Sequence, residues 1–384
     1  MFSYACLNPV SKVGLDCFGE GYGSSSLESA DAVLVRSADM HQMTMPKNVK
    51  CVARAGAGVN NIPLMELAQQ GIPVFNTPGA NANGVKELVF AAMFLAARDV
   101  VGGINWAASQ VGNDQVAKDT EKEKKKFAGF ELYGKKLGVI GLGAIGRLVA
   151  NTAIHLGMEV FGYDPYISVD GAWNLSKNVQ HIKDIKEIYA NCDYITVHVP
   201  LMDATRGMIN AEAFTLTKPT AVLINLARDV LVDEAAAVQA LCDGRLGKYV
   251  TDFPNPTVLG KPGVIAIPHL GASTEESEDN CAVAAVKQIK DFLENGNLTN
   301  CVNFPNCHMG VCTAPGRIGV FHENVKSMLS QFTTALSHTN ILNLSNVSRN
   351  TLAYTLLDLE ESVPEDTIRA IEAIPGVFGV YVVR

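Results

Sequence analysis

A glycine-rich hexapeptide in the middle of the chain constrains the fold more than any other feature. It reads Gly-Leu-Gly-Ala-Ile-Gly over residues 141–146 and directly follows an apolar segment, residues 135–140, that predicts a buried strand. Residues 147–156 predict a helix, and a second apolar strand at 158–163 ends on Asp164. A strand–GxGxxG–helix sequence with an acid about 20 residues on is typical of dinucleotide binding. This context favours a Rossmann unit over the alternative, a structural glycine-rich turn in some other α/β fold.

Each glycine of the hexapeptide has an expected task. Gly141 permits the tight turn, Gly143 lets the backbone approach a pyrophosphate, and Gly146 lets helix and strand pack closely. Free N–H groups at the start of the helix favour the phosphates. We expect Asp164 to accept hydrogen bonds from the adenosine ribose and to repel a 2′-phosphate, and no Arg or Lys follows it directly. These residues predict NAD rather than NADP as the cofactor.

The composition narrows the partners and the compartment. A net charge of −8 argues against a nucleic-acid surface. No apolar run reaches membrane-spanning length, and the first residues do not resemble a signal peptide. Nine scattered cysteines are typical of reduced thiols in the cytoplasm. A Cys/His cluster fits no standard zinc spacing, so we expect a linker with incidental thiols and no metal; its members are Cys301, Cys307, His308 and Cys312.

Apolar segments that alternate with helical stretches predict an α/β chain of several parts. We expect residues 1–98 and 276–300 to form a discontinuous, flavodoxin-like substrate-binding domain, and residues 99–275 to form the Rossmann NAD-binding domain. Residues 301–316 contain several Pro and Gly and predict a linker. Residues 317–384 have the order βαββαβ, which is the ferredoxin-like arrangement.

Two residues at predicted strand ends have the chemistry that hydride exchange with a 2-oxo acid requires. Arg228 follows a strand at 221–225, and His269 follows a strand at 264–267. Ligands bind at the carboxyl ends of the strands in such sheets. Arginine is the bidentate partner of a carboxylate, and histidine is the usual carrier of a proton near neutral pH. On this evidence alone, a structural role for either residue stays open.

Several motifs occur in a specific order over nearly the first 300 residues. They comprise residues 54–61, 76–78, 141–146 with Asp164, 225–234 and 268–274. By these motifs the chain resembles the D-isomer-specific 2-hydroxyacid dehydrogenases. The C-terminal βαββαβ segment resembles an ACT domain, a small regulatory module for amino acids.

The resemblance implies an enzyme with a small-molecule substrate. It is closest to members that use NAD to oxidise the 2-hydroxyl of 3-phospho-D-glycerate to 3-phosphohydroxypyruvate in L-serine biosynthesis. It also implies a homodimer or homotetramer in the cytoplasm, with neither nucleic acid nor membrane as a partner. Two alternatives stay open: a dehydrogenase of another D-2-hydroxy acid, and a weakly active protein that senses NAD.

The resemblance also assigns roles to individual residues. Arg228 would bind the substrate carboxylate, and His269 would donate the proton. The expected cofactor site comprises Gly141, Gly143, Ala144, Ile145, Gly146, Asp164, Val199, Leu226, Ala227, Arg228, Asp252, His269, Gly271 and Ala272. The expected substrate contacts are Arg36 and Arg54 on the phosphate and Gly56, Ala57 and Gly58 on the carboxylate. The expected contacts of an amino-acid effector are His322, Asn324 and Asn340.

The chain departs from the family pattern in two places. The segment at 252–256 is shorter than usual and lacks the Glu that pairs with the histidine. Asn255 lies nearest to that position in sequence, so we expect its side-chain oxygen to accept a hydrogen bond from His269. The alternative is a different fold of the loop in which a carboxylate from distant sequence reaches His269. The resemblance places Asp252 on the nicotinamide side of the site, which speaks against Asp252 as that carboxylate. Lys326 and Ser327 stand where serine-binding members have Pro-Gly, so we expect weak serine binding or none.

Overall fold

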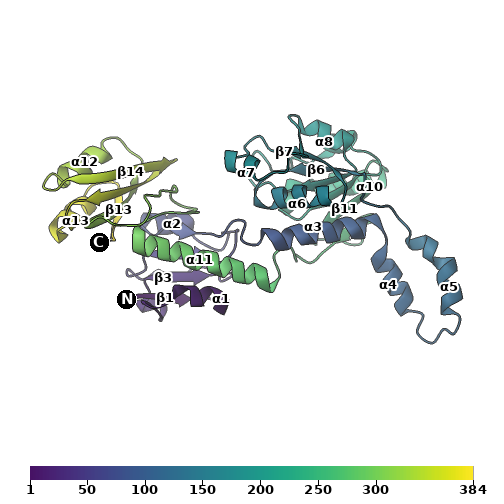
Figure 1. The fold of residues 1–384 in the computed structure, drawn as a ribbon, viewed down its shortest axis with the longest axis horizontal. Coiled ribbons are helices and arrows are strands. Elements are labelled where there is room, and N and C mark those ends of the chain that lie inside the picture. The colour runs from purple at the N-terminus through teal and green to yellow at the C-terminus, as the bar shows by residue number, and fades with distance from the viewer. Residues whose placement is uncertain (384) are drawn as a thin grey trace. The chain divides into compact units, whose positions relative to one another are not determined.

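The computed structural model describes residues 1–383 and divides them into two units (Figure 1). The terminal unit combines residues 1–81 with the chain from Glu275 onwards, and the central unit comprises Ala82–Thr274. Each unit has a parallel sheet and an apolar core of its own. Within residues 1–383, no helix combines the length and the apolar character needed to cross a membrane.

The terminal unit contains a five-stranded parallel sheet in the order β2-β1-β3-β4-β5, which is the predicted flavodoxin-like order. Alternate residues of β3 enter different cores: Ala32 and Leu34 pack with helix α11, and Val33 and Val35 pack on the other face. A strand covered on both faces is therefore apolar throughout. The elements are β1 (Phe2–Cys6), α1 (Lys12–Leu15), β2 (Tyr22–Ser24), β3 (Ala32–Val35), β4 (Cys51–Arg54), α2 (Leu64–Gln69), β5 (Val74–Phe75) and α11 (Glu275–Asn295).

The central unit contains a seven-stranded parallel sheet in the order β12-β11-β10-β9-β6-β7-β8. The strand order reverses between β6 and β9, as in a Rossmann fold. Helices α3 and α6 cover one face, and α8, α9 and α10 cover the other. The strands are β6 (Lys136–Ile140), β7 (Glu159–Tyr163), β8 (Gln180–His181), β9 (Tyr194–Val197), β10 (Val222–Asn225), β11 (Lys248–Thr251) and β12 (Val264–Ala266). The helices are α3 (Ala82–Ala97), α6 (Ala144–His155), α7 (Val169–Trp173), α8 (Ile185–Asn191), α9 (Ala211–Leu216) and α10 (Glu234–Cys242).

The expected boundary at residue 98 is wrong. Helix α3 packs against α6, and its residues Val89 and Met93 are fully buried in the core of the central unit. The boundary therefore lies before α3, between residues 81 and 82. The expected linker at 301–316 and the segment that follows it both lie within the terminal unit.

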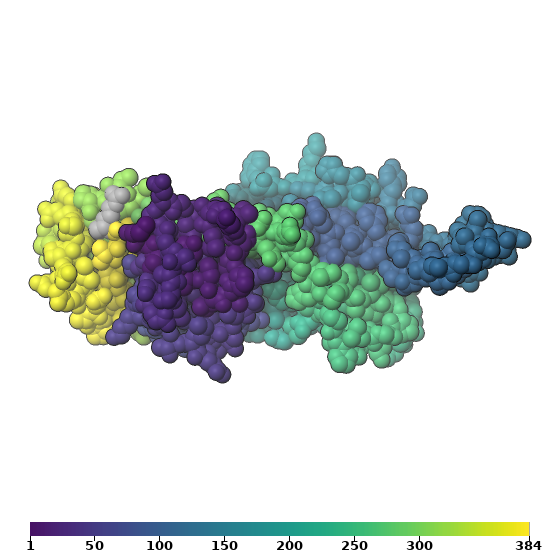
Figure 2. Space-filling view, turned by 90° about the horizontal axis from the view of Figure 1, so that it is seen from below, coloured from purple at the N-terminus to yellow at the C-terminus, as the bar shows by residue number. Residues whose placement is uncertain are grey.

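Helices α4 (Val100–Ala108) and α5 (Val116–Glu123) form an arm that stands out from the rest of the central unit (Figures 1 and 2). Helix α4 is apolar, yet none of its residues is buried, and the side chain of Ile104 is 62% exposed. The two ends of the arm meet where the N–H of Phe130 donates to the Ala97 carbonyl at 3.0 Å. Gly129 permits this closure, because a Cβ there would lie 1.8 Å from the same carbonyl oxygen.

The C-terminal segment forms a four-stranded antiparallel sheet in the order β14-β15-β13-β16. The βαββαβ succession and this strand order are the predicted ferredoxin-like arrangement. One face of the sheet packs on its own two helices, and the other face packs on α11. The elements are β13 (Gly316–Glu323), α12 (Met328–Ala335), β14 (Ile341–Arg349), β15 (Leu352–Leu359), α13 (Glu365–Glu372) and β16 (Val377–Val382).

Side chains of this sheet satisfy the end of α11. Three of them donate hydrogen bonds to the last backbone carbonyls of the helix and of the residue after it: Tyr381 to Leu293 (2.7 Å), Arg317 to Asn295 (3.0 Å) and Tyr354 to Gly296 (2.8 Å). Arg317 is buried and also forms a two-pronged ion pair with Asp358, at 2.5 and 2.8 Å. Because carbonyls at a helix end lack partners within the helix, these bonds fasten the sheet to α11.

The cysteines of the expected linker are packed rather than incidental. Cys301 and Cys307 are buried, and their sulfur atoms lie 3.3 Å from Asn303 Oδ1 and 3.4 Å from Ser345 Oγ. Among residues 1–383, no group of three or more His, Cys, Asp or Glu side chains is arranged to hold a metal ion.

Candidate active site

The glycine hexapeptide forms the turn between β6 and α6 at the carboxyl edge of the central sheet. Gly141 has φ +89°, and a Cβ there would lie 2.8 Å from both atoms of the His198 carbonyl group. A Cβ on Gly146 would lie 1.8 Å from the Gly141 oxygen, whereas a Cβ on Gly143 would meet no atom within 4 Å. The turn is closely packed on its inner side and open at Gly143, which fits the approach of a pyrophosphate to the helix start.

Asp164 follows β7 and is held beside this turn. Its carboxylate oxygens accept hydrogen bonds from the N–H groups of Leu142 (2.8 Å) and Tyr166 (2.9 Å). A carboxylate has lone pairs for further donors, so it can also accept hydroxyl groups. The fixed negative charge suits a ribose diol and disfavours an added phosphate.

The other residues expected at the cofactor lie along the same edge. Ala144 and Ile145 open α6, and the remaining residues follow β9, β10 or β12: Val199, Leu226, Ala227, Gly271 and Ala272. Because parallel strands present their carboxyl ends at one edge, the topology accounts for this distribution.

His198 borders the hexapeptide and was not singled out by the sequence patterns. Its Nε2 lies 2.9 Å from Thr196 Oγ1, and its Nδ1 is buried without a hydrogen-bond partner among residues 1–383. Burial lowers the pKa of His198 to about 3, so the ring is neutral at physiological pH. The signal that points to it is its place directly after β9, the strand beside β6 at the reversal of strand order.

Arg228 follows β10, and a buried amide holds its loop. The Asn225 side chain donates to the Arg228 carbonyl (2.8 Å) and accepts from the Ala227 N–H (3.2 Å). The guanidinium of Arg228 donates to the Ala227 carbonyl at 2.6 Å and is exposed. The backbone is therefore fixed, while the positive charge is accessible to an anion.

His269 lies after β12 in a left-handed backbone conformation, with φ +50°. A non-glycine residue seldom adopts this conformation, and such strain concentrates at functional sites. The His269 N–H is shared between the carbonyls of Ile267 and Asp252, both at 3.0 Å. Its exposed ring meets the ring of Phe253 edge-on, with centroids 5.2 Å apart.

The prediction that Asn255 pairs with His269 is wrong. The Asn255 amide oxygen accepts the Thr257 N–H at 2.9 Å, and its nitrogen donates to Glu234 Oε2 at 2.6 Å. Glu234 also accepts the hydroxyl of Tyr249 at 3.3 Å. Both ends of the amide have other partners, because the shortened segment turns tightly around this side chain.

The carboxylate of Asp252 lies in the same region as His269 and Arg228. It is buried, and Oδ2 accepts the Gly271 N–H at 3.2 Å while Oδ1 has no hydrogen-bond partner. Burial raises the pKa of Asp252, and the charges of His269 and Arg228 act in the opposite sense.

Arg36 and Arg54 lie at the carboxyl ends of neighbouring strands in the terminal unit. Arg36 Nη2 donates to Glu278 Oε1 of α11 at 2.5 Å, and both side chains are partly exposed. The Arg54 guanidinium covers Gly56, where a Cβ would lie 2.4 Å from Nη1. Val35 pairs with Arg54 in the sheet, and Arg36 pairs with Glu278, so the two arginines and Glu278 lie close together and are called the arginine cluster. Burial raises the pKa of the nearby Cys281 thiol of α11, and the charges of both arginines act in the opposite sense.

The backbone donors expected beside these arginines are only partly available. The Gly56 N–H donates to Thr77 Oγ1 at 2.8 Å, and the Thr77 N–H donates back to the Gly56 carbonyl at 3.1 Å. The expectation for Gly56 is therefore wrong, because the loop uses this N–H for its own turn. Ala57 and Gly58 stay candidates for the substrate carboxylate.

Two of the three predicted effector contacts lie together in the C-terminal sheet domain. His322 and Asn324 line a cavity of about 240 Å³ at the start of α12. His322 is buried, with Nε2 2.8 Å from Thr355 Oγ1, and burial lowers its pKa. Asn340 instead donates to Glu360 at 2.6 Å and does not line this cavity, so the structure does not bring it together with the other two and its role stays a prediction. Asn340 precedes β14, and a second asparagine that lines the cavity, Asn346, lies within that strand.

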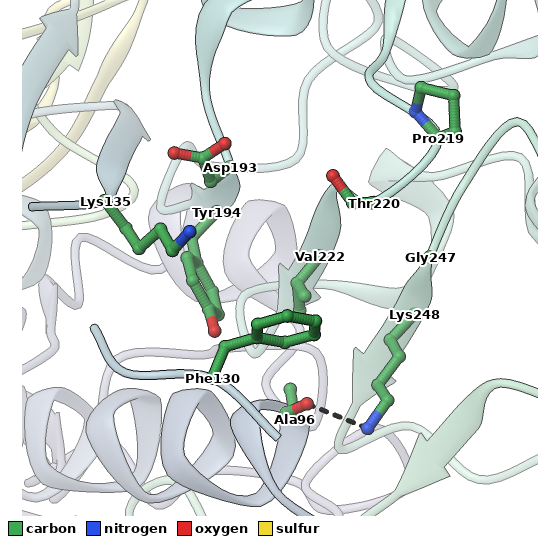
Figure 3. A pocket seen from close by; sticks show the side chains of 10 residues that line it. All are labelled: Ala96, Phe130, Lys135, Asp193, Tyr194, Pro219, Thr220, Val222, Gly247 and Lys248. Atoms are coloured by element: carbon green, nitrogen blue, oxygen red, sulfur yellow. Dashed lines mark hydrogen bonds between the residues drawn. The ribbon is translucent and has the colours of Figure 1, made fainter. Parts of the chain in front are cut away.

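A second cavity, of about 330 Å³, lies at the amino ends of β6, β9, β10 and β11 (Figure 3). The Lys135 side chain reaches toward Tyr194 in this cavity, and its Nζ lies 5.8 Å from the centroid of the Phe130 ring. Lys248 donates to the Ala96 carbonyl at 2.8 Å. This cavity is at the edge of the sheet opposite the hexapeptide, so it is separate from the cofactor residues.

The comparisons with known proteins agree with this geometry. Residues 91–271 match the D-isomer specific 2-hydroxyacid dehydrogenase, NAD binding domain. The chain belongs to the D-isomer-specific 2-hydroxyacid dehydrogenase family. The D-3-phosphoglycerate dehydrogenase of Methanocaldococcus jannaschii is 38% identical over 290 residues, which are 73% of this chain and 53% of the relative. The human D-3-phosphoglycerate dehydrogenase is 36% identical over 288 residues, 73% and 52% of the two chains. This family member thus spans about half the length of these relatives.

Solved structures extend the likeness to the family fold. The crystal structure of NAD⁺-bound 3-phosphoglycerate dehydrogenase from Entamoeba histolytica has a TM-score of 0.61 and 28% identity, and covers 79% of this chain and 98% of that one. The structure of D-2-hydroxyisocaproate dehydrogenase has a TM-score of 0.63 at 21% identity, over 79% of this chain and 100% of that one. The second likeness shows the shared fold alone.

Proposed function

We propose that the chain is an NAD-dependent D-3-phosphoglycerate dehydrogenase, which oxidises 3-phospho-D-glycerate to 3-phosphohydroxypyruvate in L-serine biosynthesis. The observation that carries the proposal is the cluster of Arg36 and Arg54 in a chain that has the family's NAD-binding domain. A phosphorylated substrate has two anionic groups, a carboxylate and a phosphate. Arg228 would bind the carboxylate, and Arg36 and Arg54 supply further positive charges for the phosphate. Relatives named D-3-phosphoglycerate dehydrogenase support the same substrate.

The residues of the central unit fit NAD. The open position at Gly143 and the start of α6 would hold the pyrophosphate, and Asp164 would hold the ribose hydroxyls. When bound, NAD supplies the acceptor for the hydride that leaves C2 of the substrate. Arg228 would bind the substrate carboxylate and fix its orientation. His269 would take the proton from the 2-hydroxyl during oxidation and return it during reduction.

Rates with phosphorylated and unphosphorylated substrates test the role of the arginines. NADH consumption is measured with 3-phosphohydroxypyruvate and with hydroxypyruvate. Arg36→Ala and Arg54→Ala are each expected to lower kcat/KM for the phosphorylated substrate by about tenfold to a hundredfold, from the loss of a charged hydrogen bond of about 1.5–3 kcal/mol. Activity on hydroxypyruvate should barely change. Arg369→Ala is the control, because Arg369 is an exposed arginine of the terminal unit paired with Glu365.

The outcomes separate the alternatives. Equal losses on both substrates would show that the arginines are structural. Higher wild-type activity on hydroxypyruvate would identify a dehydrogenase of another D-2-hydroxy acid. The Arg36–Glu278 pair should not block a phosphate, because partly exposed ion pairs contribute about 0–1 kcal/mol.

We also propose that two copies associate through the α4–α5 arm. Val101 and Ile104 of α4 are 52% and 62% exposed, and an apolar helix without a buried residue is typical of an interface. Ile104→Lys should shift the mass measured by sedimentation from dimer to monomer. Met65→Glu, at an exposed apolar residue of the terminal unit, should leave the mass unchanged.

We propose that the C-terminal sheet domain is an ACT-like module in which serine binds weakly or not at all. Lys326 and Ser327 replace the usual Pro-Gly, and Ser327, which precedes α12 with φ +66°, brings a side chain to the lining of the cavity. Micromolar serine binding in a calorimeter would contradict this proposal.

We propose a cytoplasmic location. All nine cysteines are free, and those buried in the cores include Cys51, Cys192, Cys281, Cys301 and Cys307. Free thiols are typical of a reducing compartment. Fractionation of cells that express the tagged protein tests this location.

A further inference from the structure

The proposed reaction requires His269 to gain and lose a proton, and such a histidine is usually oriented by a carboxylate. The Glu that serves this purpose in the family is absent from residues 252–256. Asn255 cannot replace it, because its amide oxygen accepts the Thr257 N–H and its nitrogen donates to Glu234. The histidine therefore needs another negative group.

We propose that Asp252 is the carboxylate partner of His269 and positions it for proton transfer, an inference that rests on the proposed function. The family resemblance places Asp252 on the nicotinamide side of the cofactor site and on that ground speaks against it as the substitute for the missing Glu. The inference concerns a second task for this residue in this protein.

Hydrogen bonds place Asp252 directly against the turn that bears the histidine. The Asp252 carbonyl accepts the His269 N–H at 3.0 Å, and Asp252 Oδ2 accepts the Gly271 N–H at 3.2 Å. Asp252 thus accepts hydrogen bonds from the residues immediately before and after Leu270, one through its backbone carbonyl and one through its carboxylate. The first of these bonds engages the N–H of His269, the residue with φ +50°.

The second carboxylate oxygen of Asp252 can still accept a hydrogen bond. Oδ1 of Asp252 is buried and has no hydrogen-bond partner among residues 1–383. A buried carboxylate oxygen without a partner is costly unless a cation or donor meets it. The positive charges that act on this carboxylate include those of His269 and Arg228. When His269 takes the hydroxyl proton it becomes an imidazolium, which a nearby carboxylate stabilises.

The two roles of Asp252 predict different kinetic changes. A residue that only holds the cofactor affects NADH affinity, whereas a partner of His269 affects the rate at saturating NADH and substrate. Asp252→Asn keeps the shape of the side chain and removes its charge. Asp243→Asn is the control, because Asp243 is a partly exposed acid of the same unit, paired with Arg245.

The first measurement compares kcat for 3-phosphohydroxypyruvate with the Kd of NADH from fluorescence titration. We expect Asp252→Asn to lower kcat by about a hundredfold while the Kd changes less than about threefold, in keeping with the usual contribution of acid–base catalysis. Weaker NADH binding with an unchanged kcat would overturn the inference. A wild type inactive on both 3-phosphohydroxypyruvate and hydroxypyruvate would instead defeat the proposed function, and the inference with it.

The second measurement introduces a carboxylate at the residue whose ring meets that of His269. In the Asp252→Asn background, Phe253→Glu should restore kcat at least tenfold relative to Phe253→Gln. In the protein that keeps Asp252, which does not depend on how Asp252→Asn folds, the two Phe253 variants should have the same kcat within about twofold. A clear gain from Phe253→Glu there would show that His269 lacked a carboxylate, and Asp252 would not be its partner.

Discussion

His198 should make the stability of the central unit sensitive to acid. Its pKa is lowered from 6.5 to about 3 by burial, so the folded state disfavours the proton that the unfolded state binds below pH 6.5. Stability from this group is fully present above pH 6.5 and is lost as the pH falls toward 3. Each pKa unit corresponds to about 1.4 kcal/mol of the free energy of unfolding. The contribution of His198 to this free energy is about 2 kcal/mol smaller at pH 5 than at pH 7.5.

Urea unfolding at pH 7.5, 6 and 5 measures this effect. The two tryptophans, Trp106 and Trp173, both belong to the central unit, so their fluorescence reports its unfolding. Between pH 7.5 and pH 5 the free energy of unfolding should decrease in both proteins. The decrease should be about 2 kcal/mol smaller in His198→Gln than in the wild type, because the variant lacks the titrating group. His181→Gln, at an exposed histidine of β8, should behave as the wild type. Identical pH slopes in His198→Gln and the wild type would refute the reasoning.

Three further predictions concern the ion pair, the turn and the cofactor. Asp358→Asn should lower the free energy of unfolding by about 3–5 kcal/mol in urea titrations followed by circular dichroism, because it leaves the buried Arg317 charge without its carboxylate. Gly146→Ala should weaken NADH binding and lower the free energy of unfolding by about 1–3 kcal/mol, because the new Cβ would collide with the Gly141 carbonyl oxygen. Gly143→Ala should weaken NADH binding alone, because its Cβ would meet no atom of the fold within 4 Å. The wild type should prefer NADH to NADPH in kcat/KM, and Asp164→Ala should narrow the difference; equal values in the wild type would contradict the assignment.

The sequence patterns predicted the parts of the fold that rest on local periodicity. Strand, turn and helix around residues 141–146 follow from apolar runs and glycines, and the ferredoxin-like order follows from the spacing of the C-terminal elements. Strands β1 and β2 were not predicted, because they are short and only partly buried. The boundary before α3 was also missed, since an apolar helix face does not reveal which core it joins.

The candidate site was predictable where a residue's place depends on a strand end. Arg228 and His269 follow strands whose carboxyl ends share one edge of the sheet. Asn255 was assigned wrongly, because its hydrogen-bond partners depend on the path of the loop rather than on its distance in sequence from the missing Glu. The unpaired nitrogen of His198 could not be predicted either, because burial is a property of the assembled sheet.

The closure of the arm at Ala97 and Phe130 makes residues 98–129 a detachable module. Because the polypeptide leaves and rejoins the central unit at one hydrogen bond, a short linker between these two residues could replace the whole excursion without stretching the sheet. If the arm joins two copies as proposed, exchanging arms between relatives at this junction would alter which copies associate, while the glycine turn at the far edge of the sheet kept its shape. The arm and the cofactor-binding turn could therefore be changed independently of each other.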